Sequence, residues 1–273
     1  MMRRAAVLLA LCLAAGRGLG AQADSGARAT LLVRAGRLLA VRTGTMLNNQ
    51  AILIEGDRIK EVGPADAVAG HAPSDVRVID LHSATVLPGL IDCHTHITGD
   101  PGDYYKQLFR MSPIDEAVRA HIFAKRTLDA RFTTVRNVGA AEFIDVALRN
   151  AINEGVVAGP RENFKKAVQA GVKIAFGTDA GVYPHGWNAK QFAHMVRWGT
   201  TPIQAIQAAT VNAADLLGWS DRVGALEPEK YADVIAVQGD PLQDVTVLEH
   251  VGFVMKGGQV VKDSLTGGAK AAR

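Results

Sequence analysis

Segments with the signals of buried strands alternate with helix signals through the middle of the chain, and this alternation constrains the fold most. The strand signals lie at residues 86–96, 132–136 and 172–176, and the helix signals at 112–130, 142–153, 162–170, 201–209 and 212–218. Strands that alternate with helices pair in parallel, because each helix returns the chain to the same end of the sheet. The middle of the chain therefore predicts an α/β fold whose parallel strands are buried by helices.

Both ends of the chain carry β-hairpin signals instead. Gly56-Asp57 and Gly257-Gly258 are two-residue turns of the kind that joins neighbouring antiparallel strands. The strands beside these turns are expected at 51–55, 58–62, 252–256 and 259–261, with a further strand at 232–237. β-Rich ends around an α/β middle predict one small β-domain assembled from residues 24–85 and 222–265. Residues 86–221 would then form a domain inserted between its two halves.

The first 23 residues have the features of a secretory signal peptide. Arg3 and Arg4 precede an apolar stretch at residues 5–15, and residues 21–23 (Ala-Gln-Ala) match a small-x-small cleavage site. The apolar stretch is far shorter than the roughly 20 residues that span a bilayer. We therefore expect an exported protein, periplasmic or extracellular, with no membrane span once the signal peptide is removed.

Removal of the signal peptide changes both the charge and the cysteine content. The peptide holds three arginines and no acid, so the formal net charge falls from +3 to 0. With no basic tract and 5% aromatic residues, the sequence gives no support for nucleic-acid binding. Cys12 is removed as well, so Cys93 has no partner for an intrachain disulfide. Because strand side chains alternate, Cys93 should point away from the face of His94, as a small buried apolar residue rather than a nucleophile.

Two histidines, His94 and His96, end the apolar run that begins at Val86. On a strand they project to the same side, together with Asp92. Two neutral imidazoles held in this way can share one metal ion at roughly 2.0–2.1 Å. Such a pair also arises by chance in a chain with 8 histidines, but its position at the end of a strand marked by Pro88-Gly89 favours a metal site.

Asp179 follows the predicted strand at 172–176, within the sequence Gly-Thr-Asp-Ala-Gly. Barrel enzymes keep catalytic groups just past the carboxyl ends of their parallel strands. An aspartate that caps a helix is the alternative interpretation. The glycines on either side favour a functional role, because glycine lets a ligand approach the backbone.

His185 lies on the same loop, within the sequence Tyr-Pro-His-Gly, and is either a surface residue or part of the site. The remaining histidines have ordinary positions on predicted helices or in the predicted β-domain and are weak candidates for metal ligands: His71, His82, His121, His194 and His250.

Five segments, in this order, resemble the amidohydrolase superfamily and, within it, the imidazolonepropionase-like and Xaa-Pro dipeptidase-like branch: VLPGLIDCHTH, FTTVRNVG, KIAFGTDAGVYPHG, TPIQAIQAATVNAADLLGW and VGALEPEKYADVIAV. The resemblance implies a (β/α)₈ metallo-dependent hydrolase barrel with a small β-sandwich built from both termini. It also implies that His94 and His96 bind metal at the first barrel strand. Asp179 would close the last strand, contact the metal and move protons.

The activity that the resemblance implies is metal-dependent hydrolysis of carbon–nitrogen bonds, in dipeptides or N-acyl amino acids. The cofactor would be Zn²⁺ or another divalent metal, as one ion or two, which activates a water molecule. Asp179 would take a proton from that water and return it to the leaving amine. Tyr183 and His185 would bind the small-molecule or dipeptide substrate, with His185 holding it or stabilising the developing oxyanion.

The chain also departs from the superfamily pattern. Only 83 residues separate His96 from Asp179, whereas a complete barrel needs about 200 at roughly 30 residues per βαβ unit. We therefore expect an incomplete barrel, with an internal deletion near residues 160–162. The carboxylated lysine and the two further histidine ligands of the superfamily have no match. A catalytically inactive remnant is thus one alternative, and a homo-oligomer whose copies pool strands is another. A smaller departure is Glu229, where the superfamily commonly has glycine.

Overall fold

The computed structural model describes residues 30–96, 110, 122–138 and 160–266. The predicted signal peptide and the predicted helix at 142–153 lie outside these residues, as does His121. Of the helix expected at 112–130, the described part is helical at residues 122–129. None of the helices in the described part of the chain has the length and apolar character needed to cross a membrane.

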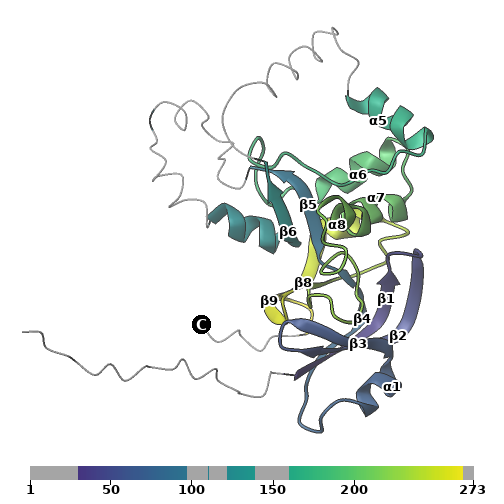
Figure 1. Cartoon of the computed structure of the whole chain (residues 1–273), viewed down its shortest axis with the longest axis vertical. Helices are drawn as coiled ribbons and strands as arrows, with labels where there is room; N and C mark the ends of the chain where they lie inside the picture. The colour runs from purple at the N-terminus through teal and green to yellow at the C-terminus, as the bar shows by residue number, and fades with distance from the viewer. Residues whose placement is uncertain (1–29, 97–109, 111–121, 139–159, 267–273) are drawn as a thin grey trace, which may run out of the picture.

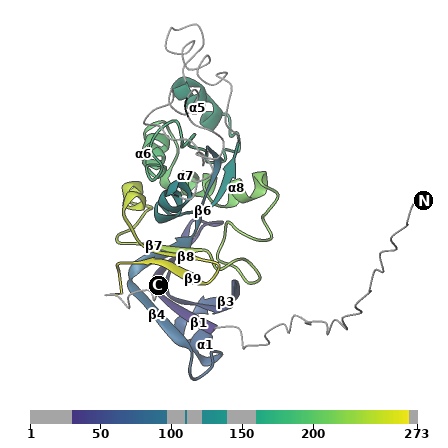
Figure 2. The ribbon, with the colours of Figure 1, turned by 90° about the vertical axis from the view of Figure 1, so that its left-hand side faces the viewer.

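Strands from both ends of the chain form one seven-stranded sheet (Figures 1 and 2), in the order β3-β2-β1-β4-β7-β8-β9. Its strands are β1 (Thr30–Ala40), β2 (Thr45–Glu55), β3 (Arg58–Pro64), β4 (Arg77–Pro88), β7 (Val234–Val237), β8 (Val251–Lys256) and β9 (Gln259–Asp263). β4 pairs antiparallel with β7, from Thr85 opposite Val237 to Pro88 opposite Val234. This ladder joins the N-terminal strands to the C-terminal ones. The sandwich form of the β-domain and the domain limits at 24–85, 86–221 and 222–265 stay predictions.

The two predicted hairpins are confirmed, and their turns lie against each other. β2 pairs with β3 across Gly56 (φ +62°), and β8 pairs with β9 across Gly257 (φ +53°) and Gly258 (φ +75°). A β-carbon on Gly258 would lie 2.1 Å from the carbonyl oxygen of Gly56. Glycine is therefore needed there both for the left-handed backbone and for the close approach of the turns. A short helix, α1 (Ala65–Gly70), follows β3 and packs Val68 into the sheet.

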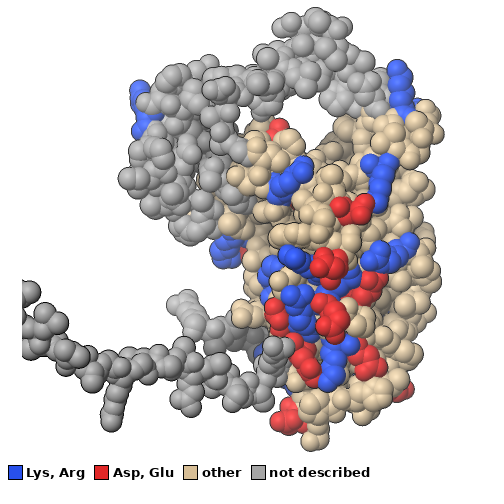
Figure 3. Space-filling view, in the orientation of Figure 1, with Lys and Arg blue, Asp and Glu red and all other residues tan. Residues whose placement is uncertain are grey.

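Basic and acidic side chains are interleaved on the face of the sheet seen in Figure 3. Arg42 and Glu227 form one exposed ion pair with Nε and Oε1 2.5 Å apart, and Lys60 pairs with Glu55. Exposed pairs of this kind contribute about 0–1 kcal/mol each. These charged side chains thus form a solvated surface that adds little to stability.

The middle of the chain packs helices around a short parallel sheet of β5 (Leu90–Thr95) and β6 (Phe132–Asn137). The helices are the segment at 122–129, α5 (Pro160–Gln169), α6 (Lys190–Arg197), α7 (Pro202–Ala208) and α8 (Val211–Leu216), and a 3₁₀ helix, η1 (Val245–His250), precedes β8. β5 follows β4 through Gly89, where a β-carbon would lie 2.1 Å from Thr133 Oγ1. The mixed α/β fold is confirmed, whereas the incomplete form of the barrel stays a prediction.

The strand predicted at 172–176 is not formed as a regular strand, and this expectation was wrong. The segment is extended and runs beside β5, but its hydrogen bonds follow no continuous ladder. Cys93 N donates to Phe176 O (2.9 Å), while Phe176 N donates to Ala208 O (2.8 Å) at the start of the α7–α8 connection. Of this segment Phe176 is buried, whereas Val172 is exposed, and the end of α7 rather than a second strand accepts the N–H of Phe176.

One apolar cluster includes side chains from both the sheet and the helices. Phe176 stacks between Phe132 and Phe192, with ring centroids 5.4 and 4.6 Å apart. The same cluster includes Leu87 of β4 and Ile235 of β7. Burial of these large side chains fixes the end of β5 above the sheet, and that end carries the two histidines.

Candidate metal centre

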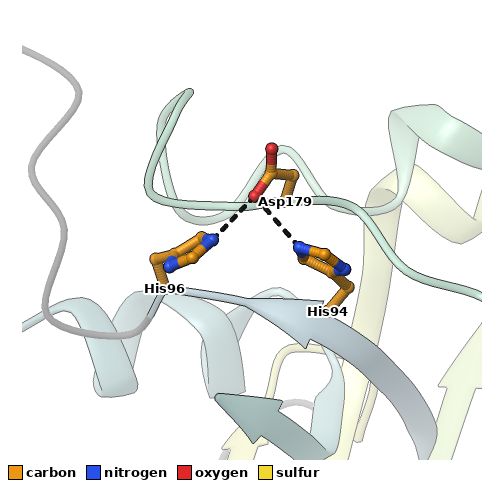
Figure 4. A group of neighbouring side chains, drawn as sticks. All are labelled: His94, His96 and Asp179. Atoms are coloured by element: carbon orange, nitrogen blue, oxygen red, sulfur yellow. Dashed lines mark ion pairs between the residues drawn. The ribbon is translucent and has the colours of Figure 1, made fainter. Parts of the chain in front are cut away.

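His94 and His96 lie at the carboxyl end of β5 and project to the same side, as the strand alternation predicted (Figure 4). Their ring centroids are 5.7 Å apart with the planes inclined by 65°. The His94 side chain is 50% exposed and that of His96 20% exposed. Cys93, which precedes His94, is buried, and burial raises the pKa of its thiol to about 11. The expectation of a small buried residue at Cys93 is therefore confirmed.

Asp179 brings its carboxylate between the two imidazoles (Figure 4). Its Oδ1 atom is 2.9 Å from His96 Nε2 and 3.4 Å from His94 Nε2. The three ligand-type atoms all lie within 4.8 Å of one another. Within the described residues, this is the one group of three or more histidine, cysteine or acidic side chains close enough to share an ion.

The geometry of this group suits a divalent ion. Two ligand atoms each about 2.1 Å from one ion, at a tetrahedral angle, are about 3.4 Å apart, close to the separations found here. Asp179 Oδ1 is also buried without a hydrogen bond, although His96 Nε2 is near it. A buried acceptor left unpaired costs about 1–3 kcal/mol, which a bound cation would offset. Two histidines and one carboxylate are also a ligand set of catalytic zinc sites, with a coordination position left for water.

The backbone around Asp179 is shaped by the approach of its loop to β5. Asp179 itself has a left-handed conformation, φ +60°, which few residues other than glycine adopt. A β-carbon on Gly177 would lie 2.8 Å from His94 Cβ, and one on Gly181 would lie 2.7 Å from His96 Cβ. The sequence analysis attributed these glycines to the approach of a ligand. Instead they allow the loop to pack directly against the two histidines.

A buried carboxylate, Asp92, lies beneath the three-residue group. Its side chain accepts hydrogen bonds from the backbone N–H of His94 (3.1 Å), from the N–H and the hydroxyl of Thr178, and from Asn188 Nδ2 (2.7 Å). Asp92 is fully buried. Desolvation raises its pKa, and the hydrogen bonds offset part of that effect. Strand alternation placed Asp92 on the correct face, but its partners lie 86 and 96 residues away in sequence, so no local pattern revealed them.

The two residues predicted to bind substrate lie on the loop after Asp179. His185 is buried, its Nδ1 atom is 3.1 Å from Thr127 Oγ1, and its ring stacks on Phe123. The alternative of a surface histidine is thus wrong. Tyr183 is partly buried, and burial together with Asp92 and Asp179 raises the pKa of its phenol. Neither side chain belongs to the three-residue group, and their substrate roles stay predictions.

The other described histidines lie away from this group. His71 and His82 pair with acidic neighbours in the terminal sheet region, at 3.0 Å each. His194 packs its ring against Trp198 on α6, and His250 ends η1. These positions agree with the expectation that these histidines have ordinary structural roles.

Comparison with known families gives a match to the model described as "Amidohydrolase family", at residues 85–162 and 152–261. The two matched segments include His94, His96 and Asp179. They overlap at residues 152–162, a range that includes residues 160–162, where an internal deletion is expected.

Comparison with curated proteins gives shorter matches. The chain is 40% identical over 104 residues to an ochratoxinase of Aspergillus niger, which covers 36% of this chain and 21% of the ochratoxinase. It is 33% identical over 195 residues to a 5-methylthioadenosine/S-adenosylhomocysteine deaminase of Teredinibacter turnerae, which covers 63% of this chain and 43% of the deaminase. The chain thus spans less than half the length of either relative.

Among solved structures, the fold is similar to that of a Xaa-Pro dipeptidase with methionine bound in its active site. The TM-score is 0.73 at 22% identity, and the alignment covers 85% of this chain and 100% of that one. At this identity the likeness concerns the fold alone.

Proposed function

Because the chain belongs to the amidohydrolase family, we propose that it is a metal-dependent hydrolase of carbon–nitrogen bonds in dipeptides or N-acyl amino acids. One observation carries the proposal: two imidazole nitrogens lie 2.9 and 3.4 Å from one buried oxygen of Asp179 that makes no hydrogen bond. The names of the relatives, an ochratoxinase and a deaminase, and of the structural neighbour, a dipeptidase, support the reaction class.

His94, His96 and Asp179 would hold the ion, Zn²⁺ or another divalent metal. Such an ion polarises a scissile carbonyl and lowers the pKa of water to near 7. Asp179 has a second oxygen that points away from the imidazoles (Figure 4), and its side chain is 40% exposed. This oxygen is placed to accept a proton from the attacking water and to return it to the leaving nitrogen.

Tyr183 and His185 would position the substrate. The Tyr183 phenol is a hydrogen-bond donor, and it would donate to a substrate oxygen. His185 is held by Thr127 and by the Phe123 ring, and would fix the loop that presents Tyr183. We also propose that the protein is exported to the periplasm or the cell exterior, which rests on the signal-peptide features of residues 1–23 alone.

An inactive chain is the alternative, and it too has an observation in its favour. The family match is divided into two segments that meet at residues 152–162, and the first relative is matched over 21% of its length. Such a chain could keep the metal ligands of the first and last barrel strands and still lack turnover.

Hydrolysis assays on the purified chain separate these alternatives. Zn²⁺-loaded protein is expected to cleave Xaa-Pro dipeptides or N-acyl amino acids, to lose activity with a chelator and to regain it with added Zn²⁺. Asp179→Asn should be inactive, whereas His82→Ala, which changes an exposed histidine of the terminal sheet, should retain the activity. Metal binding without turnover would favour the inactive alternative, and a chain that binds no metal would contradict the proposal itself.

A further inference from the structure

The Asp92 carboxylate contacts both the histidine strand and the Asp179 loop of the candidate metal centre. Its Oδ1 atom accepts the N–H of His94 on β5 and the N–H of Thr178 on the facing loop, each at 3.1 Å. Its Oδ2 atom accepts the Thr178 hydroxyl and Asn188 Nδ2. A single side chain thus joins the strand of the histidines to the residue that precedes Asp179.

Asn188 extends this connection to the start of α6. Besides donating to Asp92, its Nδ2 atom donates to Thr178 Oγ1 at 3.1 Å, and its Oδ1 atom accepts the N–H of Gly186 at 3.2 Å. Asn188 and Asp92 are both fully buried, and Thr178 is nearly so. Three polar side chains therefore form a closed network in which each donor has an acceptor.

We infer that Asp92, acting through Thr178 and Asn188, is a positioning residue that holds the Asp179 carboxylate against His94 and His96; this inference rests on the proposed metal centre. Asp179 has φ +60°, and a strained backbone persists only where its surroundings fix it. The N–H groups of Thr178 and Asp179 both donate to His94 O, at 3.2 and 2.7 Å. The side chains of Asp92 and Asn188 hold the turn at Thr178 and Asp179 through their hydrogen bonds to Thr178.

A merely structural role would not require a charge at this position. Burying a carboxylate is costly, and an apolar side chain of similar size often fills a core as well or better. A carboxylate offers several acceptor sites, enough for two N–H groups, a hydroxyl and an amide at once. Four donors surround Asp92 because the Thr178 turn lies close to β5. The same close contact brings Asp179 between His94 and His96.

The test compares Asp92→Asn with the double variant Asp92→Asn/Asn188→Asp. In the single variant the amide NH₂ of position 92 faces the Asn188 NH₂ directly, donor against donor, where in the wild type Asn188 Nδ2 donates to Asp92 Oδ2 at 2.7 Å. The exchange in the double variant restores the complementarity, because the amide at position 92 can donate to the carboxylate introduced at position 188. The control is Asp233→Asn, a buried carboxylate of the terminal sheet that accepts from Lys256 and Gly257 N at 2.8 Å each.

The first readout is Co²⁺ binding, followed by the visible absorption of the bound ion, which reports its ligand geometry. Loss of an outer hydrogen-bond partner typically weakens metal affinity about 10- to 100-fold. We expect a loss in this range and an altered spectrum for Asp92→Asn, recovery in the double variant, and the wild-type spectrum and affinity for Asp233→Asn. Wild-type affinity and spectrum in Asp92→Asn would overturn the inference.

The second readout needs no metal and separates this inference from the proposed function. Hydrogen exchange of the amides at residues 177–181 should be faster in metal-free Asp92→Asn than in wild type and unchanged in Asp233→Asn. If wild type takes up no Co²⁺, the metal centre is wrong, and unchanged exchange in Asp92→Asn then overturns the positioning role as well. If Asp92→Asn does not fold, Thr178→Val, which removes one hydroxyl at nearly constant volume, is judged by the same two measurements.

Discussion

Four residues other than glycine have a left-handed backbone in the described part of the chain, and two of them illustrate different causes. Asp179, at φ +60°, is held by its hydrogen bonds to β5 and forms the candidate metal centre. Glu229, at φ +68°, has an exposed side chain, and only its backbone is fixed, by Ile59 and Arg58. The sequence analysis noted that the superfamily commonly has glycine at this position.

Glu229→Gly is therefore expected to stabilise the protein. Removing the β-carbon relieves a left-handed conformation that costs roughly 1 kcal/mol, partly offset by the larger backbone entropy of glycine in the unfolded chain. Urea unfolding should show a higher free energy of unfolding by up to about 1 kcal/mol. Glu61→Gly, at a regular position of β3, should instead destabilise. A destabilised Glu229→Gly would show that the glutamate side chain makes a favourable contact.

Cys93 is expected to resist modification in the native state. Raising the thiol pKa from 9.0 to about 11 lowers the thiolate fraction at pH 8 about 100-fold, and burial adds a steric barrier. In a chain that begins at residue 24, where Cys93 is the one cysteine, a disulfide reagent should react slowly at pH 8. The rate should rise as the pH approaches 11. Unfolding in guanidinium should make the reaction fast, and an equally fast native reaction would contradict the burial of Cys93.

At the residue scale, strand alternation correctly predicted that His94 and His96 project to the same side and that Cys93 is buried. These features depend on local geometry alone. The partners of Asp92 could not be predicted in the same way. They depend on the loop at 177–188 folding back on β5, which is a tertiary contact. The burial of His185 was missed for the same reason, because Phe123 and Thr127 lie about 60 residues earlier.

At the scale of elements, the capping signal at Thr201 and the two glycine turns located a helix start and two hairpins, whereas the apolar run at 172–176 was misread as a strand. α7 begins at Thr201-Pro202 as expected. The two glycine turns join the strands of their hairpins as expected. An apolar run reports burial but not the partner of its backbone groups. Here Phe176 N bonds to Ala208 O, so the ladder with β5 is interrupted.

Thr201→Ala tests the contribution of the capping box to α7. Thr201 Oγ1 accepts Gln204 N at 3.3 Å, and Thr201 N donates to Gln204 Oε1 at 2.8 Å. Losing the N-cap should lower the free energy of unfolding by about 1 kcal/mol. A double-mutant cycle with Gln204→Ala should show that the two losses are not additive, because both residues serve the same box. Additive losses would mean that the reciprocal bonds contribute nothing in solution.

At the scale of the whole molecule, the terminal sheet and the helical part share one core. Leu87 and Ile235 of the sheet belong to the same buried cluster as Phe192 of α6 and Ile206 of α7. The meeting of the two ends of the chain in one sheet followed from their matching hairpin signals. The joining of this sheet to the helices could not be foreseen, because it depends on how β4 continues into β5 at Gly89.

A shared core predicts a single cooperative unfolding transition. Tryptophan fluorescence, which reports on Trp187, Trp198 and Trp219, and far-ultraviolet circular dichroism should give the same urea midpoint. Leu87→Ala should lower the urea midpoint of both signals together. The corresponding loss in the free energy of unfolding should be about 2–5 kcal/mol. Two separate transitions in the wild type would contradict the common core.

The most direct test of the account is a calorimetric titration of the metal-free chain with Zn²⁺. Because His94, His96 and Asp179 form one group of ligands, we predict uptake of one ion per chain, lost in His94→Ala and in Asp179→Asn and retained in His82→Ala. A wild-type chain that takes up no Zn²⁺, or an Asp179→Asn variant that binds it as tightly as the wild type, would contradict the central claim.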